Sequence, residues 1–252
     1  AREIGDRSNE GNQLGNLGLC YSALGQTSRA IEYLEQALVI MREIGDRQVE
    51  GIIVGNLAEV LVDEKRYSDA LRFVLECSMI GNEIGSPLIN SDGDRHSSLI
   101  HLLQNDLSAA RTAAETARRH DVPQNNHYVL ALLGVIEVRL AHNAANEHAE
   151  NPKRKSDFAP SETFTAAVQQ AEHMLAQSAQ NYEALYAKAL ALSGLALCEG
   201  PQHIAAAIAA YRGARAINQD AGIVKRVLRL FEELAKADAH GVLNEVRAAA
   251  GE

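Results

Sequence analysis

The sequence has 252 residues, of which 46% are hydrophobic and none is Trp, and its formal net charge is -9. Nucleic-acid binding depends on neutralising phosphates with Lys and Arg, so this acidic balance argues against a nucleic-acid partner. The apolar runs, such as residues 129–136, are far shorter than the roughly 20 residues that span a bilayer, so we expect no membrane segment.

A block of six residues at the start of the chain recurs 40 positions later. Residues 2–7 (REIGDR) are identical to residues 42–47, and in the same register residues 15–17 (GNL) match residues 55–57. A third, weaker copy begins at Glu83. Several matched blocks in one phase indicate a structural repeat of about 40 residues.

Each repeat is predicted to contain two helices, which span about 9–24 and 27–43 in the first unit. Apolar residues recur there every three or four positions, as on one face of a helix. Gly25 and Gly45 follow these helices, where a terminating glycine is expected. Because Gly5 matches Gly45, we interpret residues 1–7 as the tail of a helix from a preceding repeat.

Regular repeats are expected over residues 8–120, and divergent ones over residues 121–217. The polar stretch 143–160 is predicted to be a flexible insertion, because polar segments cannot offset their ordering entropy. Residues 218–252 are predicted to form capping helices. The helix 223–234 has one apolar face and charges opposite, which is typical of a solubilising terminal cap.

The chain resembles the tetratricopeptide repeat family, since Leu17-Gly18, Tyr21, Leu24-Gly25, Ala30 and Ala37 have the spacing of that repeat. The 40-residue period is similar to the long variant in kinesin light chains, Pins-type polarity adaptors and C-terminal arrays of bacterial signal-transduction ATPases. The resemblance implies an all-α, right-handed solenoid of antiparallel helix pairs, here about five pairs and a C-terminal capping helix. It also implies that the first helices line a concave face that holds a peptide.

In the resembling families, Asn side chains at the places of Asn16 and Asn56 grip the backbone of the bound peptide. An amide offers a donor and an acceptor to any main chain. The third unit has Arg95 in the corresponding region, which could receive a carboxylate. The predicted peptide-binding residues are Asn12, Asn16, Asn56, Glu59, Arg95 and His96. The alternative is that Asn16 and Asn56 only bond to the adjacent repeat.

The sequence contains no recognisable catalytic or cofactor-binding motif. The sequence has no P-loop and no HExxH pair, and the alternating Asn90, Asp92 and Asp94 lack the glycine and closing Glu of a calcium loop. We therefore expect no enzyme, no cofactor and no metal. Three widely spaced cysteines without a CxxC pair indicate free thiols, which favours a cytoplasmic location.

These features favour a non-catalytic scaffold that binds a peptide or protein segment. Two alternatives stay open. One is a ligand-sensing or autoinhibitory C-terminal array of a bacterial multidomain signalling ATPase or transcription regulator. The other is a structural oligomerisation spacer. An uncapped N-terminal end would expose apolar surface, so self-association through that end is also expected.

Overall fold

The computed structural model describes residues 2–147 and 158–251, and every regular element in these ranges is helical. The α-helices are α1 (Arg2–Ala23), α2 (Thr27–Ile44), α3 (Arg47–Asp63), α4 (Tyr67–Ile84), α5 (Pro87–Leu103), α6 (Leu107–Arg119), α7 (Pro123–Glu147), α8 (Pro160–Gln177), α9 (Tyr182–Glu199), α10 (Ile204–Ile217), α11 (Ala221–Ala235) and α12 (Asn244–Gly251). A short 3-10 helix, η1 (Pro201–His203), precedes α10.

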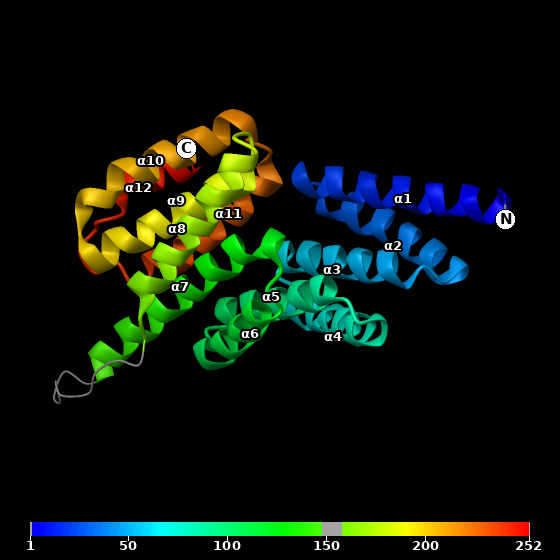
Figure 1. Ribbon diagram of the computed structural model, residues 1–252, viewed down its shortest axis with the longest axis horizontal. Coiled ribbons are helices and arrows are strands. Elements are labelled where there is room, and N and C mark those ends of the chain that lie inside the picture. The colour runs from blue at the N-terminus through cyan, green and yellow to red at the C-terminus, as the bar shows by residue number, and fades with distance from the viewer. Residues whose placement is uncertain (1, 148–157, 252) are drawn as a thin grey trace.

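Consecutive helices pack as pairs, and the pairs stack side by side into a curved solenoid (Figure 1). The prediction of an all-α solenoid is therefore confirmed. The described residues contain the five expected pairs, α1/α2 through α9/α10, followed by α11 and by α12, which contacts both α10 and α11.

The 40-residue period is visible in the backbone of the turns. Gly25, Lys65 and Asn105 lie 40 positions apart, each at the turn inside one of the first three pairs, and all take a left-handed conformation with φ of 75°, 59° and 64°. Gly45 and Gly85 take the same conformation between pairs, where they cap α2 and α4. Left-handed residues terminate helices by satisfying their last carbonyls, so these turns set the helix lengths.

Small residues at the period of the repeat let the two helices of a pair lie close together. Ala30, Ala70 and Ala110 are spaced 40 residues apart, and all three have no exposed surface. An added Cβ at Gly18 would lie 2.6 Å from Leu34, the neighbouring side chain of α2. The alanine and glycine positions of the repeat therefore have a packing function.

Two expected boundaries differ from the structure. The helix α1 continues from Arg2 without a break at Gly5, since glycine is tolerated inside a helix at a cost of about 1 kcal/mol. The insertion expected at 143–160 is shorter, because α7 extends to Glu147 and α8 begins at Pro160. Residues 148–157, which include the basic run 153–155, lie outside the described residues.

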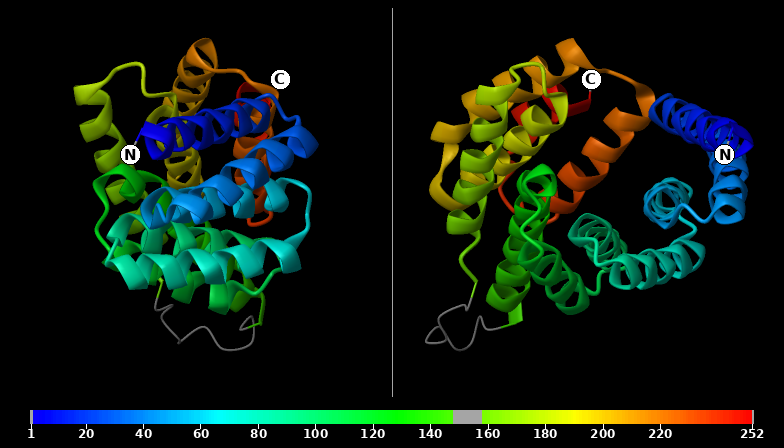
Figure 2. Two further views of the ribbon diagram at one scale, coloured as in Figure 1. Left: turned by 90° about the vertical axis from the view of Figure 1, so that its right-hand side faces the viewer. Right: turned by 45° about the vertical axis from the view of Figure 1, so that its right-hand side comes forward.

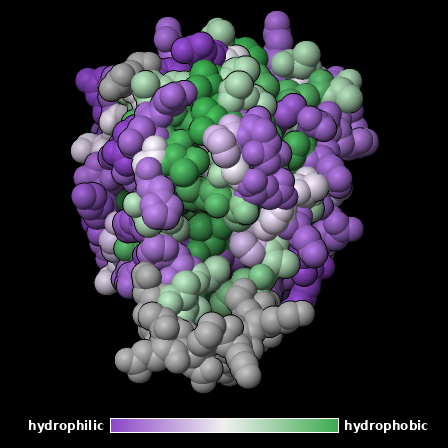
Figure 3. All heavy atoms as spheres, turned by 90° about the vertical axis from the view of Figure 1, so that its left-hand side faces the viewer, coloured by the Kyte–Doolittle hydropathy of each residue, from purple (hydrophilic) through white to green (hydrophobic). Residues whose placement is uncertain are grey.

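The expectation that every apolar run is too short to cross a membrane is wrong for α7. Its segment Pro123–Ala145 passes that test by length and composition, yet just over half of it is buried in the structure. Leu132, Leu133 and Ile136 are at most 2% exposed, so packing accounts for its apolar character. On the side of the molecule that contains α7–α10, a band of hydrophobic residues lies between hydrophilic ones (Figure 3).

The position of α11 departs most from the sequence-based expectation. Its charged side is not in solvent, because Arg226 and Arg229 pair with Asp63 of α3. α11 also contacts α1, α7 and α9, while α12 packs on α10. The right-hand view of Figure 2 shows α11 crossing the inner side of the solenoid between its two ends. The helix therefore connects the first and last repeats instead of only covering the end.

Candidate functional site

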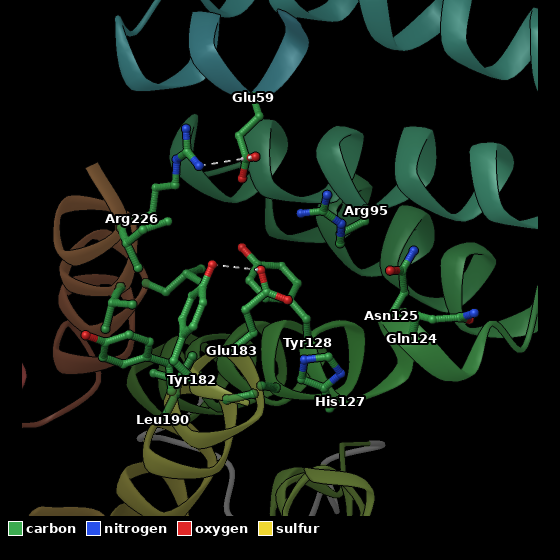
Figure 4. A pocket seen from close by; sticks show the side chains of 16 residues that line it. Glu59, Arg95, Gln124, Asn125, His127, Tyr128, Tyr182, Glu183, Leu190 and Arg226 are labelled. Atoms are coloured by element: carbon green, nitrogen blue, oxygen red, sulfur yellow. Dashed lines mark hydrogen bonds and ion pairs between the residues drawn. The ribbon is translucent and has the colours of Figure 1, made fainter. Parts of the chain in front are cut away.

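A cavity of about 280 Å³ opens on the inner side of the solenoid (Figure 4). Its lining comes from α3, α5, α7, α9 and α11, which are all first helices of their pairs. The apolar part of the lining includes Ala131, Tyr186, Ala187 and Leu230. The polar part consists of Glu59, Arg95, Gln124, Asn125, His127, Tyr128, Tyr182, Glu183 and Arg226.

A network of opposite charges links α3 and α11 at one side of the cavity. Arg226 forms an ion pair with Glu59, with 3.4 Å between Nη1 and Oε2, and a second with Asp63. Burial alone would raise the pKa of Glu59, but the neighbouring Arg226 and Arg95 outweigh it and lower that pKa to about 2. Glu59 is therefore a carboxylate at any physiological pH.

Arg95 points into the cavity from α5 and is held there by three neighbours. Its guanidinium carbon lies 5.0 Å from the centre of the Tyr128 ring, within the range of a cation–π contact. Its Nη2 lies 3.0 Å from Nε2 of His96 and 3.6 Å from Oδ1 of Asp92. Among the described residues no hydrogen bond uses Nε or Nη1 of Arg95, so these donors are available to a ligand.

Two buried histidines are neutral, His127 in the cavity lining and His96 behind it. His96 and His127 are 2% and 3% exposed, and both have an Nδ1 without a hydrogen-bond partner in the described part of the chain. Burial, with the nearby charge of Arg95, lowers the pKa of His96 to about 3 and that of His127 to about 4. A neutral His96 can accept the hydrogen bond from Arg95, which fixes the direction of the guanidinium.

Residues 9–78 match the family model described as tetratricopeptide repeat. Residues 9–78 therefore carry repeats of this family. A search of solved structures found similarity to the structure titled "TPR2AB-domain:pHSP90-complex of yeast Sti1", with 12% identity, a TM-score of 0.39, and coverage of 95% of this chain and 98% of that chain. A search of curated protein sequences gave no match. Repeats of this family generally serve as protein-interaction scaffolds, because stacked helix pairs create an extended concave surface.

The structure separates the predicted site residues into three groups. Glu59 and Arg95 line the cavity. Asn12 and Asn16 are exposed on α1 and Asn56 is half-buried on α3, and all three lie outside the cavity lining. His96 is buried behind Arg95 and contacts its guanidinium, and its predicted contact with a peptide stays a prediction.

The alternative interpretation was that Asn16 and Asn56 only bond to the adjacent repeat, and no hydrogen bond among the described residues supports it. Within residues 2–147 and 158–251, no side-chain hydrogen bond is formed by Asn16 or Asn56. Both amides therefore keep their donor and acceptor groups for another molecule. Their role in binding a peptide stays a prediction.

The residues that the second half of the chain contributes to the cavity were not predicted from the sequence. Tyr128, Tyr182, Glu183 and Arg226 come from α7, α9 and α11, where the repeat has diverged. Arg226 and Arg229 lie three residues apart, on one side of an amphipathic helix, and this spacing was the available signal. It did not indicate that the side faces α3, because that contact joins residues 163 and 166 positions apart.

Proposed function

We propose that this protein is a non-catalytic scaffold that binds a peptide or protein segment along the concave face of its first helices. The observation that carries the proposal is the cavity at the centre of that face, with Arg95 held so that two of its donor nitrogens are unused. The open amides of Asn16 and Asn56 occupy one repeat position on α1 and α3. A peptide backbone lying on these helices would find hydrogen-bond partners at successive repeats.

The chemistry of the cavity supports recognition of a segment with mixed character. The donors of Arg95 and the amides of Gln124 and Asn125 suit backbone carbonyls or a carboxylate, while Tyr186 and Leu230 offer apolar contact. A few polar groups placed on a largely apolar surface are typical of ligand pockets. We expect one side chain of the partner to enter the cavity.

The double variant Asn16→Asp with Asn56→Asp tests the proposal. Each substitution replaces an amide by an acceptor-only carboxylate, so hydrogen bonds to backbone carbonyls are lost. In affinity capture from a cell lysate, we expect partners of the wild type to be reduced at least tenfold on the double variant, with an unchanged circular dichroism spectrum and melting temperature. The matched control is Gln13→Glu with Gln36→Glu, which adds the same charge at exposed positions of α1 and α2. Equal capture by all three proteins would refute the proposal.

A second candidate is a ligand-sensing array, and the size of the cavity favours it. A volume of about 280 Å³ approaches the lower end of small-molecule pockets, which is roughly 300 Å³. Native mass spectrometry of the purified protein tests this function. A reproducible added mass that disappears on denaturation, and that is reduced in Arg95→Gln, would support it. A mass equal to that of the chain alone, in protein purified from several sources, would contradict it.

A further inference from the structure

The last helix pair meets the first two through a compact group of polar contacts, of which the ionic ones are with α3. Asp63, at the end of α3, has only 2% of its side chain exposed. Its carboxylate accepts hydrogen bonds from Nε of Arg226 at 2.8 Å and from Nη1 of Arg229 at 2.7 Å. Its backbone carbonyl accepts a third from Nζ of Lys225 at 2.9 Å. Arg226 also donates to the hydroxyl of Ser22 on α1.

The two carboxylates of this contact are stabilised by the basic residues of α11. Glu59 and Asp63 lie one turn apart on α3, where like charges repel each other. Among the described residues, cations that pair with both of them come from α11 alone, since Arg226 contacts the two carboxylates. Removing α11 from this place would leave the repulsion uncompensated until solvent reached Asp63.

The backbones of α1 and α11 also fit closely at the same contact. An added Cβ at Gly222 would lie 2.1 Å from the carbonyl oxygen of Ser22 and 2.7 Å from that of Ala23. Such a distance is not seen for real Cβ atoms, and the obstacle is backbone, which cannot rotate away. Gly222 is therefore required for α11 to reach α1.

The remaining faces of α11 belong to the second half of the molecule. Phe231 lies 6.1 Å from the Tyr211 ring of α10 in an edge-on contact, and Glu233 forms a buried ion pair with Arg139 of α7. The apolar face of α11 thus packs on its own half, and only its basic face reaches α1 and α3. Polar contacts between parts of a chain separate more readily than apolar ones.

We propose that the basic face of α11 is a reversible clasp that closes the solenoid over the C-terminal ends of α1 and α3. The clasp consists of Lys225, Arg226 and Arg229 on α11, with Asp63 and Glu59 on α3 and Ser22 on α1. Arg229 keeps two buried nitrogens, Nε and Nη2, without a partner among the described residues. Buried donors without partners are costly, which lowers the free energy needed to open the clasp.

Opening the clasp changes the binding site, and this consequence rests on the proposed function. Ile223, Arg226, Val227 and Leu230 of α11 form one wall of the cavity. When α11 moves away with the second half, this wall is removed and the carboxylates of α3 become accessible. A partner segment that crosses the C-terminal ends of α1 and α3 exchanges the α11 wall of the cavity for the freed carboxylates of α3, so it binds the open form and the clasp competes with it.

Small-angle X-ray scattering on the full chain tests closure without any partner. We expect the wild type to keep its compact radius of gyration between about 50 mM and 1 M NaCl, because salt screens buried ion pairs such as those of Asp63 only weakly. Gly222→Ala and the double variant Arg226→Gln with Arg229→Gln should be expanded at low salt. The control Arg118→Gln with Arg119→Gln removes two charges from exposed positions of α6 and should behave as wild type. One radius for all proteins at all salt concentrations, with native circular dichroism spectra, would overturn the clasp.

Affinity capture with the same variants separates the clasp from the proposed function. Both clasp variants should capture at least threefold more partner than wild type, and adding Asn16→Asp with Asn56→Asp should abolish the gain. Expanded variants with unchanged, Asn-dependent capture would overturn the competition while leaving the scaffold function intact. Expanded variants without any Asn-dependent capture would leave the clasp intact and overturn the scaffold function.

Discussion

Single residues in this protein are positioned by contacts that span several helices. Arg95 is an example, since its guanidinium is fixed by Tyr128 of α7 on one side and by His96 and Asp92 of its own helix on the other. A long side chain loses much rotamer entropy on ordering. Because the fold has already ordered Arg95, a ligand would find it prepared at little further entropic cost.

The buried His96 makes a prediction about acid stability. Its pKa is about 3 in the folded protein, below the ordinary value near 6.5, so the unfolded chain binds a proton first as pH falls. The stability it contributes is complete above pH 6.5 and is lost as pH falls from there toward 3. We expect wild type to lose up to about 1.4 kcal/mol per pH unit from this residue below pH 6.

Urea unfolding at pH 7 and pH 5 measures this effect. His96→Gln should show a smaller loss of stability between the two pH values than wild type, although His127 still contributes because its pKa is about 4. The exposed His240→Gln serves as the control and should lose as much stability as wild type. Equal losses in His96→Gln and wild type would show that His96 does not govern this pH dependence.

At the scale of helices, packing depends on which neighbour covers a repeat position. Leu17 on α1 and Leu57 on α3 occupy the same position, 40 residues apart, yet Leu17 is 42% exposed and Leu57 is 1% exposed. The difference arises because α3 lies against the preceding pair, while α1 has a neighbouring pair on one side only. The repeat therefore specifies which residue type occupies the position. The neighbouring helix pair determines how much that residue contributes to the stability of the fold.

The two leucines form a matched test of this argument. Leu57→Ala should destabilise the protein by about 2–5 kcal/mol, as for other buried leucines that leave a cavity. Leu17→Ala should cost less than about 1 kcal/mol, since its side chain is partly in water in both states. Chemical denaturation of both variants measures the difference. Similar losses would mean that the exposed face of α1 is covered in solution.

A second helix-scale feature is the wedge that Phe164 of α8 makes between α7 and α9. Phe164 has no exposed surface, and an added Cβ would lie 2.5 Å from its ring at Gly134 and 2.2 Å from it at Gly194. The two glycines, 60 residues apart, thus form one slot for one ring. This slot holds the diverged repeats together.

Gly194→Ala should therefore destabilise the protein, by about 1–3 kcal/mol as in other overpacked cores. A smaller side chain in the slot should relieve the clash, so Phe164→Leu is expected to cost less in the Gly194→Ala background than in wild type. A double-mutant cycle from thermal or urea unfolding measures this coupling. Additive costs would indicate that the ring and the helix are not in contact.

At the scale of the whole molecule, the structure is a solenoid whose ends are connected. Solenoid repeats ordinarily contact their neighbours only, so stability is close to a sum over adjacent interfaces. The contacts of α11 with α1 and α3 add one long-range interface to that sum. This interface joins residues from both ends of the chain. Arg226 of α11 therefore contributes to the same cavity as Glu59 of α3.

The sequence by itself determined the helical class, the repeat period and the helix ends at Gly25 and Gly45. These features are local: a helix face needs apolar residues every three or four positions, and a left-handed turn favours glycine. Because both signals repeat with a period of 40, the pairing of α1 with α2 and of α3 with α4 follows from neighbouring segments. Glu59 and Arg95 of the cavity were found by the same periodicity.

Only the tertiary structure decided that His96 is buried, that α7 and α9 complete the cavity and that α11 returns to α1. The curvature of the stack is the sum of small rotations between pairs, so it determines which distant helices meet. No local pattern around Asp63 indicates that its partners are Arg226 and Arg229. The ionic contact between the second and last repeats is therefore a consequence of the accumulated geometry of the whole solenoid.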